Sequence, residues 1–193
     1  MFIVAGLGNP GPEYEKTRHN IGFRVIDQMA SMYRVKVRTI ECKALTGMVH
    51  RAGATPFLLA KPVTFMNLSG DSLAMLLQKY SITSEQLIVV HDDLDLECGN
   101  VRLKKGGSTA GHHGLESTAQ RLGTLDFIRI RIGIDRPPTR DEVVDYVLSP
   151  FRSVEKATAE EAVVFASHMI LDCIDYGFEH AFNKYPRKKN ANP

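Results

Sequence analysis

Short apolar runs alternate with amphipathic segments along this chain, which is the pattern of an α/β domain. Apolar and β-branched runs predict strands over residues 2–5, 45–49, 57–60, 87–90, 100–104 and 127–134. Apolar residues at helical spacing predict helices over residues 21–33, 73–80, 115–122, 141–148 and 153–176. In the last of these helices, Ser153 is the expected N-cap and Glu155 lies in the first turn. We therefore expect an α/β domain with a mixed or mostly parallel sheet.

Polar residues follow four of the predicted strands, at the point where each strand ends. They are the segment from Asn9 onward, Met66-Asn67, His91-Asp92 and the Gly106–His113 loop. In open α/β sheets, ligands bind at the carboxyl ends of the strands. Four clusters placed in this way predict one shared cleft.

The connection between the first strand and the first helix, residues 6–20, has no apolar periodicity. Connections of this length are usually functional or disordered, and one that begins beside a core strand favours function. Its glycines match the Gly-x-Gly-x-x-Gly fingerprint of dinucleotide-binding proteins. However, Pro10 and Pro12 flank the third glycine, and the helix begins only near residue 20. The loop therefore shapes a cleft and does not hold a pyrophosphate.

Composition excludes several classes of protein. At 193 residues and 44% apolar residues, the chain is ordinary for one globular domain. No apolar run approaches the roughly 20 residues that a membrane span needs, and the N-terminus lacks the features of a signal peptide. Three widely spaced cysteines, Cys42, Cys98 and Cys173, suggest neither a disulfide framework nor a metal site. We expect a cytoplasmic protein with reduced thiols and no membrane contact.

Positive charge is unevenly distributed along a chain whose net charge is only +2. Residues 102–140 contain eight lysines and arginines but three acidic residues. This bias indicates a polyanion that contacts one face, although on charge alone a solvated surface is the simpler interpretation. A second basic cluster, Arg187-Lys188-Lys189, lies near the C-terminus.

Two chemical interpretations of the histidines remain open from the residues alone. Imidazole and carboxylate ligands make a metal-dependent hydrolase one of them. Its ligands would be His91, Asp92, Asp93, His112 and His113.

The other interpretation is general-base catalysis. His19 and Asp92 both fall at strand ends, and a buried carboxylate fixes the tautomer of a catalytic histidine. The amides of Asn9, Asn20 and Asn67 can hold a peptide-like group or a water molecule. Because no Gly-x-Ser-x-Gly elbow is present, direct attack by an activated water is favoured over a covalent intermediate.

Phe65 and Met66 precede a predicted helix, where packing in the core is their ordinary role. An exposed aromatic residue in a nucleic-acid cleft would instead stack on a base. The sequence pattern does not separate these two roles.

Six segments recur in a characteristic order: Val4–Gly11, Thr17–Asn20, Lys61–Gly70, His91–Asp95, Gly111–Leu115 and Arg129–Ile134. Together they resemble bacterial-type peptidyl-tRNA hydrolases over residues 2–185. The resemblance implies a single α/β domain, residues 1–186, with a twisted mixed sheet surrounded by helices, followed by the basic tail, residues 187–193. It also implies a monomer that hydrolyses the ester between a peptide and the 3′-terminal ribose of tRNA, without a metal or organic cofactor.

The resemblance also implies roles for individual residues. His19 corresponds to the general base, Asp92 to the acid that supports it, and Asn9 to the residue that recognises N-blocked peptidyl-tRNA. Asn67 is a catalytic residue as well, because its amide can stabilise an oxyanion. The expected substrate-binding residues are Tyr14, Phe65, Met66, Asn67, His113, Lys104 and Arg131, the last two forming a phosphate-binding pair.

A protein of another class also fits these motifs, namely an RNA-binding protein on the same fold without activity. The intact His19 and Asp92 pair argues against it. A metal-dependent hydrolase is the third possibility, and sensitivity to EDTA distinguishes it.

The chain departs from the family pattern at His113, where asparagine is usual. An imidazole replaces only part of the hydrogen bonding of an amide, and imidazoles gain charge in mild acid. We therefore expect substrate binding to be more sensitive to mild acid than in a relative with asparagine. The measurement is KM across pH for the wild type and His113→Asn, and indistinguishable profiles would refute the expectation.

Overall fold

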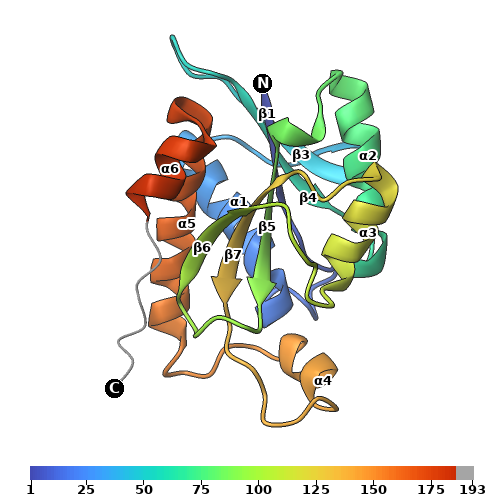
Figure 1. The fold of residues 1–193 in the computed structure, drawn as a ribbon, viewed down its shortest axis with the longest axis vertical. Helices are drawn as coiled ribbons and strands as arrows, with labels where there is room; N and C mark the ends of the chain where they lie inside the picture. Colours follow the sequence, from blue (N-terminus) through green and yellow to red (C-terminus); the bar gives the residue numbers. More distant parts are fainter. Residues whose placement is uncertain (186–193) are drawn as a thin grey trace.

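The computed structural model describes residues 1–185, in which seven strands form one sheet in the order β2-β3-β4-β1-β5-β7-β6 (Figure 1). The central, parallel strands are β4 (Phe57–Pro62), β1 (Phe2–Gly6), β5 (Leu87–Asp93) and β7 (Ile128–Gly133). The antiparallel strands are β2 (Thr39–Glu41) and β3 (Ala44–Val49) at one edge and β6 (Val101–Lys105) at the other. The predicted mixed sheet is therefore confirmed, whereas the predicted tail, residues 187–193, lies outside the described residues.

Helices cover both faces of the sheet, because alternate residues of the central strands are apolar on both sides. The helices on one face are α1 (Ile21–Tyr33), α5 (Lys156–Tyr176) and α6 (Phe178–Lys184), and those on the other are α2 (Ser69–Tyr80) and α3 (His113–Leu122) (Figure 1). Val90 and Ile130 belong to the first apolar layer, and Val89 and Phe127 belong to the second. A shorter helix, α4 (Val143–Val147), lies beyond the carboxyl ends of β5 and β7.

Gly22 allows the first turn of α1 to touch the ends of two central strands. A Cβ atom at this position would lie 2.5 Å from the carbonyl oxygens of both Leu7 and Val90. Only glycine permits so close an approach. The approach brings the 3₁₀ turn η1 (Arg18–Asn20), directly before α1, next to the end of β5.

Several expected bounds differ from the structure; helix α2, for example, begins at Ser69, before the expected residue 73. Helix α5 begins at Lys156, so the predicted start and the Ser153 N-cap were wrong. Glu155 occupies the N-cap position, and its carboxylate is held by the backbone N–H and side chain of Arg152 and by Arg18. Strand β5 extends through His91–Asp93, beyond the predicted end.

Two elements were not predicted from the sequence at all. Strand β2 has three residues and α6 has seven, and both are too short to show a clear apolar period. Tertiary contacts decide such short elements, so pattern reasoning does not find them.

Two further findings concern the helices and the thiols of the described residues. None of the helices between residues 1 and 185 combines the length and apolar character that crossing a membrane requires. Cys42, Cys98 and Cys173 are free thiols, and burial raises the pKa of the Cys173 thiol to about 12.

Candidate active site

A cavity of about 270 Å³ lies at the carboxyl ends of the central strands. Its lining includes Asn9 after β1, Met66 after β4, Asp92 at the end of β5, and His113 from the Gly-rich loop. The prediction that four polar clusters share one cleft is therefore confirmed.

The Gly-rich loop reaches the cavity by a route that the sequence did not predict. It follows β6, which runs antiparallel to β7, so the carboxyl end of β6 lies at the opposite end of the sheet. The loop must run back along the sheet to deliver His112 and His113 to the cavity. Arg129 of β7 holds it there, because its Nη1 donates to the Ser108 carbonyl oxygen at 2.9 Å. Arg129 is only 2% exposed, so it supports the loop and does not face solvent.

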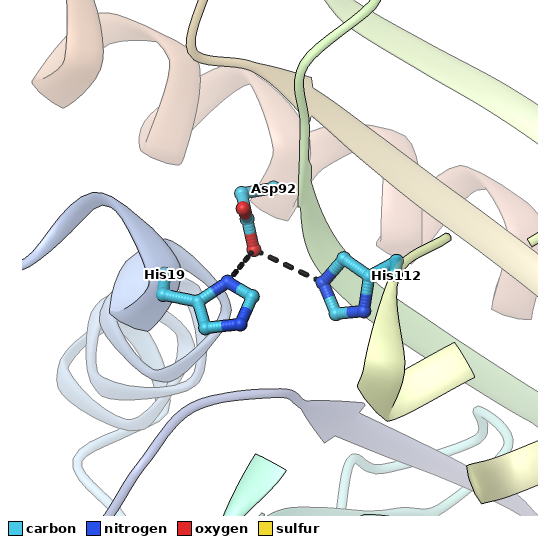
Figure 2. A group of neighbouring side chains, drawn as sticks. All are labelled: His19, Asp92 and His112. Atoms are coloured by element: carbon cyan, nitrogen blue, oxygen red, sulfur yellow. Dashed lines mark hydrogen bonds and ion pairs between the residues drawn. The ribbon is translucent and has the colours of Figure 1, made fainter. Parts of the chain in front are cut away.

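His19 and Asp92 form the central pair of the site. His19 lies in η1, and its Nδ1 is 2.8 Å from Oδ1 of Asp92, which is 2% exposed on β5 (Figure 2). An ionised carboxylate only accepts hydrogen bonds, so Nδ1 of His19 carries the proton. The unprotonated nitrogen is then Nε2, on a ring that lines the cavity. This is the arrangement that a general base requires.

His112 is a second histidine on the same carboxylate oxygen, and the predicted site did not include it. Its Nε2 lies 3.1 Å from Oδ1 of Asp92, and Figure 2 shows both rings directed toward this atom. Its Nδ1 accepts the backbone N–H groups of Gly114 and Leu115 at the start of α3. The helix terminus thus places the proton on Nε2. Sequence reasoning weighed His112 only as a metal ligand, although its place before a helix was a signal for this capping role.

Burial and pairing set the charges of the site. Burial opposes protonation of His19, but the charge and hydrogen bond of Asp92 prevail and raise the His19 pKa above its ordinary value. Burial likewise opposes ionisation of Asp92, but the two histidines hold its pKa well below the usual range. Burial, helped by His112, lowers the pKa of His91 to about 3, so His91 is neutral.

The five-residue metal site considered from the sequence is not assembled. His91 Nδ1 donates to the Asp92 carbonyl oxygen at 2.7 Å, and Arg131 is bonded to Asp93. Among residues 1–185, the one group of donors close enough to hold a metal is His19, Asp92 and His112, within 4.8 Å of one another. Those atoms already bond to one another, so a metal ion would have to displace the hydrogen bonds of Asp92.

Asn9 is held from two sides by the backbone around it. It exchanges hydrogen bonds with Asn20, whose side chain accepts the Asn9 N–H and donates to the Asn9 carbonyl oxygen, both at 2.9 Å. The backbone N–H of Met66 donates to Oδ1 of Asn9 at 2.8 Å. An N–H donor requires an oxygen acceptor, so this bond fixes the amide orientation and leaves the Asn9 NH₂ group for the cavity.

Not all of the predicted substrate-binding residues line this cavity. Phe65, which is 57% exposed, and Asn67 line it together with the buried Met66. Tyr14 is not part of this lining; it lies in a turn of the first loop, where its carbonyl oxygen accepts the Thr17 hydroxyl. Its role in the predicted site stays a prediction.

Helix α4 provides a part of the cavity that the sequence did not assign. We call it the apolar wall, and it consists of Val143, Val144, Val147 and Leu148. It lies in the segment that follows β7, so a fourth parallel strand also contributes to the cleft. Its side chains add an apolar part to a lining that also contains histidines and amides.

The predicted phosphate pair lies on one face of β6 and β7. Lys104 is half-buried, and a Cβ atom on Gly107 would lie 2.6 Å from its Nζ, so the Gly-rich loop crosses the lysine closely. The Arg131 side chain is 20% exposed and donates from Nε to Oδ2 of Asp93 at 2.6 Å. Arg102 lies directly opposite Arg131 in the antiparallel register of β6 and β7. These three cations form a basic surface next to the cavity.

Comparison with known proteins extends the likeness from motifs to the whole chain. A family model described as peptidyl-tRNA hydrolase matches residues 3–193. The peptidyl-tRNA hydrolase of Caldanaerobacter subterraneus subsp. tengcongensis is 45% identical over 185 residues, covering 96% of this chain and 99% of that protein. The one from Bacillus subtilis is 48% identical over 163 residues, covering 84% and 86%. The crystal structure of peptidyl-tRNA hydrolase from Acinetobacter baumannii matches with a TM-score of 0.90 and 32% identity, covering 97% of this chain and 95% of that one.

The charge of Asp92 predicts how His19 titrates. We expect the His19 imidazole to titrate above the ordinary histidine value and Asp92→Asn to lower its pKa, because the carboxylate stabilises the imidazolium. NMR titration of the imidazole signals measures this. Asp95→Asn is the control, since that carboxylate is bonded to Arg136 at the mouth of the cavity. An unchanged His19 pKa in Asp92→Asn would contradict the pairing.

Proposed function

This chain belongs to the peptidyl-tRNA hydrolase family, and we propose that it hydrolyses the ester of peptidyl-tRNA with a water molecule that His19 activates. The observation that carries the mechanism is the His19–Asp92 pair at the edge of a cavity large enough for a peptide end. The same proposal makes the enzyme a cytoplasmic monomer, whose substrate is peptidyl-tRNA and which needs no cofactor.

The reaction begins with proton transfer to His19. A water molecule attacks the ester carbonyl carbon while Nε2 of His19 takes its proton, and Asp92 stabilises the imidazolium that forms. The tetrahedral intermediate then collapses. The ribose oxygen leaves with the proton from His19, so the products are a free peptide carboxyl group and tRNA. His112 supports this step indirectly, because it keeps Asp92 in place from the other side.

Two amide groups stabilise the oxyanion and recognise the peptide. Asn67 lines the cavity and stabilises the developing oxyanion, a task worth about 3–4 kcal/mol per donor in other acyl-transfer sites. The NH₂ group of Asn9 donates to a peptide carbonyl, which an N-blocked substrate has and an aminoacyl-tRNA lacks. The rigid bonds of Asn9 to Asn20 and Met66 support this selective role.

The basic surface of Arg102, Lys104 and Arg131 holds the tRNA by phosphate contacts. Such contacts orient a nucleic acid without reading its sequence, which suits an enzyme that acts on many tRNAs. Arg129 lies opposite Lys104 in the same pair of strands but is only 2% exposed, so it does not share this role.

His19→Ala tests the catalytic role. We expect kcat to fall by roughly 10²–10⁴-fold, because the general base is lost, with tRNA affinity within about threefold of the wild type. The assay is hydrolysis of an N-acetylated aminoacyl-tRNA, with and without EDTA, together with a tRNA binding measurement. His50→Ala, an exposed histidine at the end of β3, is the matched control.

Three outcomes would contradict the proposal. Parallel loss of binding and turnover in His19→Ala would argue against a purely catalytic role. Inhibition by EDTA would favour a metal-dependent hydrolase. A folded wild type that binds tRNA but hydrolyses no substrate would favour an RNA-binding protein without activity.

The phosphate contacts predict a specific dependence on salt. We expect Lys104→Ala and Arg131→Ala to raise KM mainly and to reduce the slope of log KM against log salt by about one each, because each phosphate contact releases counterions. Arg38→Ala, an exposed arginine next to β2 at the opposite edge of the sheet, is the control. Salt slopes equal to that of the wild type would refute the assignment.

A further inference from the structure

Arg18, the residue before His19, is buried although it carries a full charge. It is 2% exposed, and its guanidinium makes hydrogen bonds in two directions. Nη1 donates to Ser149 Oγ at 2.6 Å and to the Pro150 carbonyl oxygen at 2.7 Å. Nη2 donates to Glu155 Oε2 at 2.8 Å. A buried arginine in such a fork fixes the relative positions of its partners.

The partners of Arg18 lie in α4, in the connection that follows it and at the start of α5. Ser149 and Pro150 follow α4, whereas Glu155 occupies the N-cap position of α5. The Arg18 guanidinium also lies 4.1 Å from the centre of the Tyr146 ring on α4. Its backbone N–H donates to the Ser149 carbonyl oxygen at 3.0 Å. One side chain therefore ties η1, with His19, to α4 and to α5.

Helix α4 depends on these contacts because it has little packing of its own. It is five residues long, and Val147 is its one buried residue. A helix this short is not stable in isolation. Apart from the Arg18 contacts, Tyr146 anchors α4 to the end of the sheet, since its hydroxyl donates to the Ile134 carbonyl oxygen at 2.5 Å.

The position of α4 decides the shape of the cavity, since α4 and Leu148 carry the apolar wall. Val144 lines the cavity and is 62% exposed, so its side chain is open to a ligand that enters the cavity. The wall lines the same cavity as His19 and Asn9. A peptide whose ester lies at His19 would place the side chain of its last residue within reach of this wall.

We propose that Arg18 is a positioning residue for substrate selection, which holds α4 so that the apolar wall binds the side chain of the peptide's last residue. This inference rests on the proposed function. It predicts a preference for substrates whose last residue is large and apolar over those that end in glycine. A single methylene group in an apolar enzyme pocket typically changes specificity by roughly 10–200-fold.

The test compares N-acetyl-leucyl and N-acetyl-glycyl esters carried on the same tRNA. For the wild type we expect kcat/KM to be about tenfold higher with leucine. Arg18→Lys keeps the charge but loses the fork, and it should reduce this ratio by about fivefold through a higher KM for the leucyl substrate. The glycyl substrate should stay within about twofold, and the acid limb of the pH profile of kcat/KM should not move, because His19 and Asp92 are intact.

Two further variants make the comparison specific. Arg152→Lys is the matched control, because Arg152 bonds the same Glu155 carboxylate but is 70% exposed at its side chain and should leave the ratio unchanged. Ser149→Ala removes one acceptor of Arg18 on the α4 side and should reduce the ratio in the same direction by a smaller factor. If Arg18→Lys unfolds below the assay temperature, Ser149→Ala serves as the test of the positioning role.

Two results would overturn this inference while leaving the proposed function in place. A wild type that hydrolyses both substrates equally well would show that the apolar wall does not bind the side chain. Equal losses for both substrates in Arg18→Lys, or a shifted acid limb, would show that Arg18 acts on His19 or on the fold as a whole. Failure of the wild type to hydrolyse either substrate would instead overturn the proposed function.

Discussion

The buried carboxylate of Asp92 is the interaction on which the site depends. Its Oδ1 accepts hydrogen bonds from His19 and His112, which come from the first loop and the Gly-rich loop. A charge that is 2% exposed is costly unless donors surround it. Because both histidines donate to Asp92 and stabilise its charge, they hold the two loops at the same atom. The requirement of a stable buried charge and the requirement of an oriented base are thus met by one arrangement.

The direction of each strand decides how the segment after it reaches the site. The carboxyl ends of the parallel strands β1, β4, β5 and β7 lie at the same end of the sheet. The segments that follow these strands therefore meet there without any additional contact to bring them together. Strand β6 runs the other way, so its carboxyl end lies at the opposite end of the strands. Its loop must return over the sheet, and Arg129 holds the loop there. Gly22 helps to place the turn that carries His19, since it lets η1 approach β5 closely. The cavity is therefore a product of topology, one close helix contact and one buried arginine.

Much of this arrangement could be predicted from the sequence, for reasons that particular residues make clear. Apolar runs such as Leu87–Val90 identify buried strands, and the shared edge of parallel strands brings His19 close to Asp92. Motif resemblance then assigned their roles. His112 and the apolar wall could not be found in this way. The place of His112 before a helix signals a cap, but its bond to Asp92 depends on the return of the loop from β6. The helix of the apolar wall was expected from its apolar spacing, but its place beyond the ends of β5 and β7 depends on the completed fold.

The arginines of this chain show most clearly what a sequence leaves undecided. Arg129 and Arg131 alternate with isoleucines in one strand, yet the first is buried and supports a loop, while the second is partly exposed and bonded to Asp93. Arg18 and Arg24 flank the start of α1, yet only Arg18 is enclosed by its partners. A guanidinium is weakly hydrated and presents several donors at fixed angles, so it can either bind phosphate or join backbone segments in the interior. What decides between these uses is whether carbonyl groups from distant segments surround it, and that depends on the completed fold.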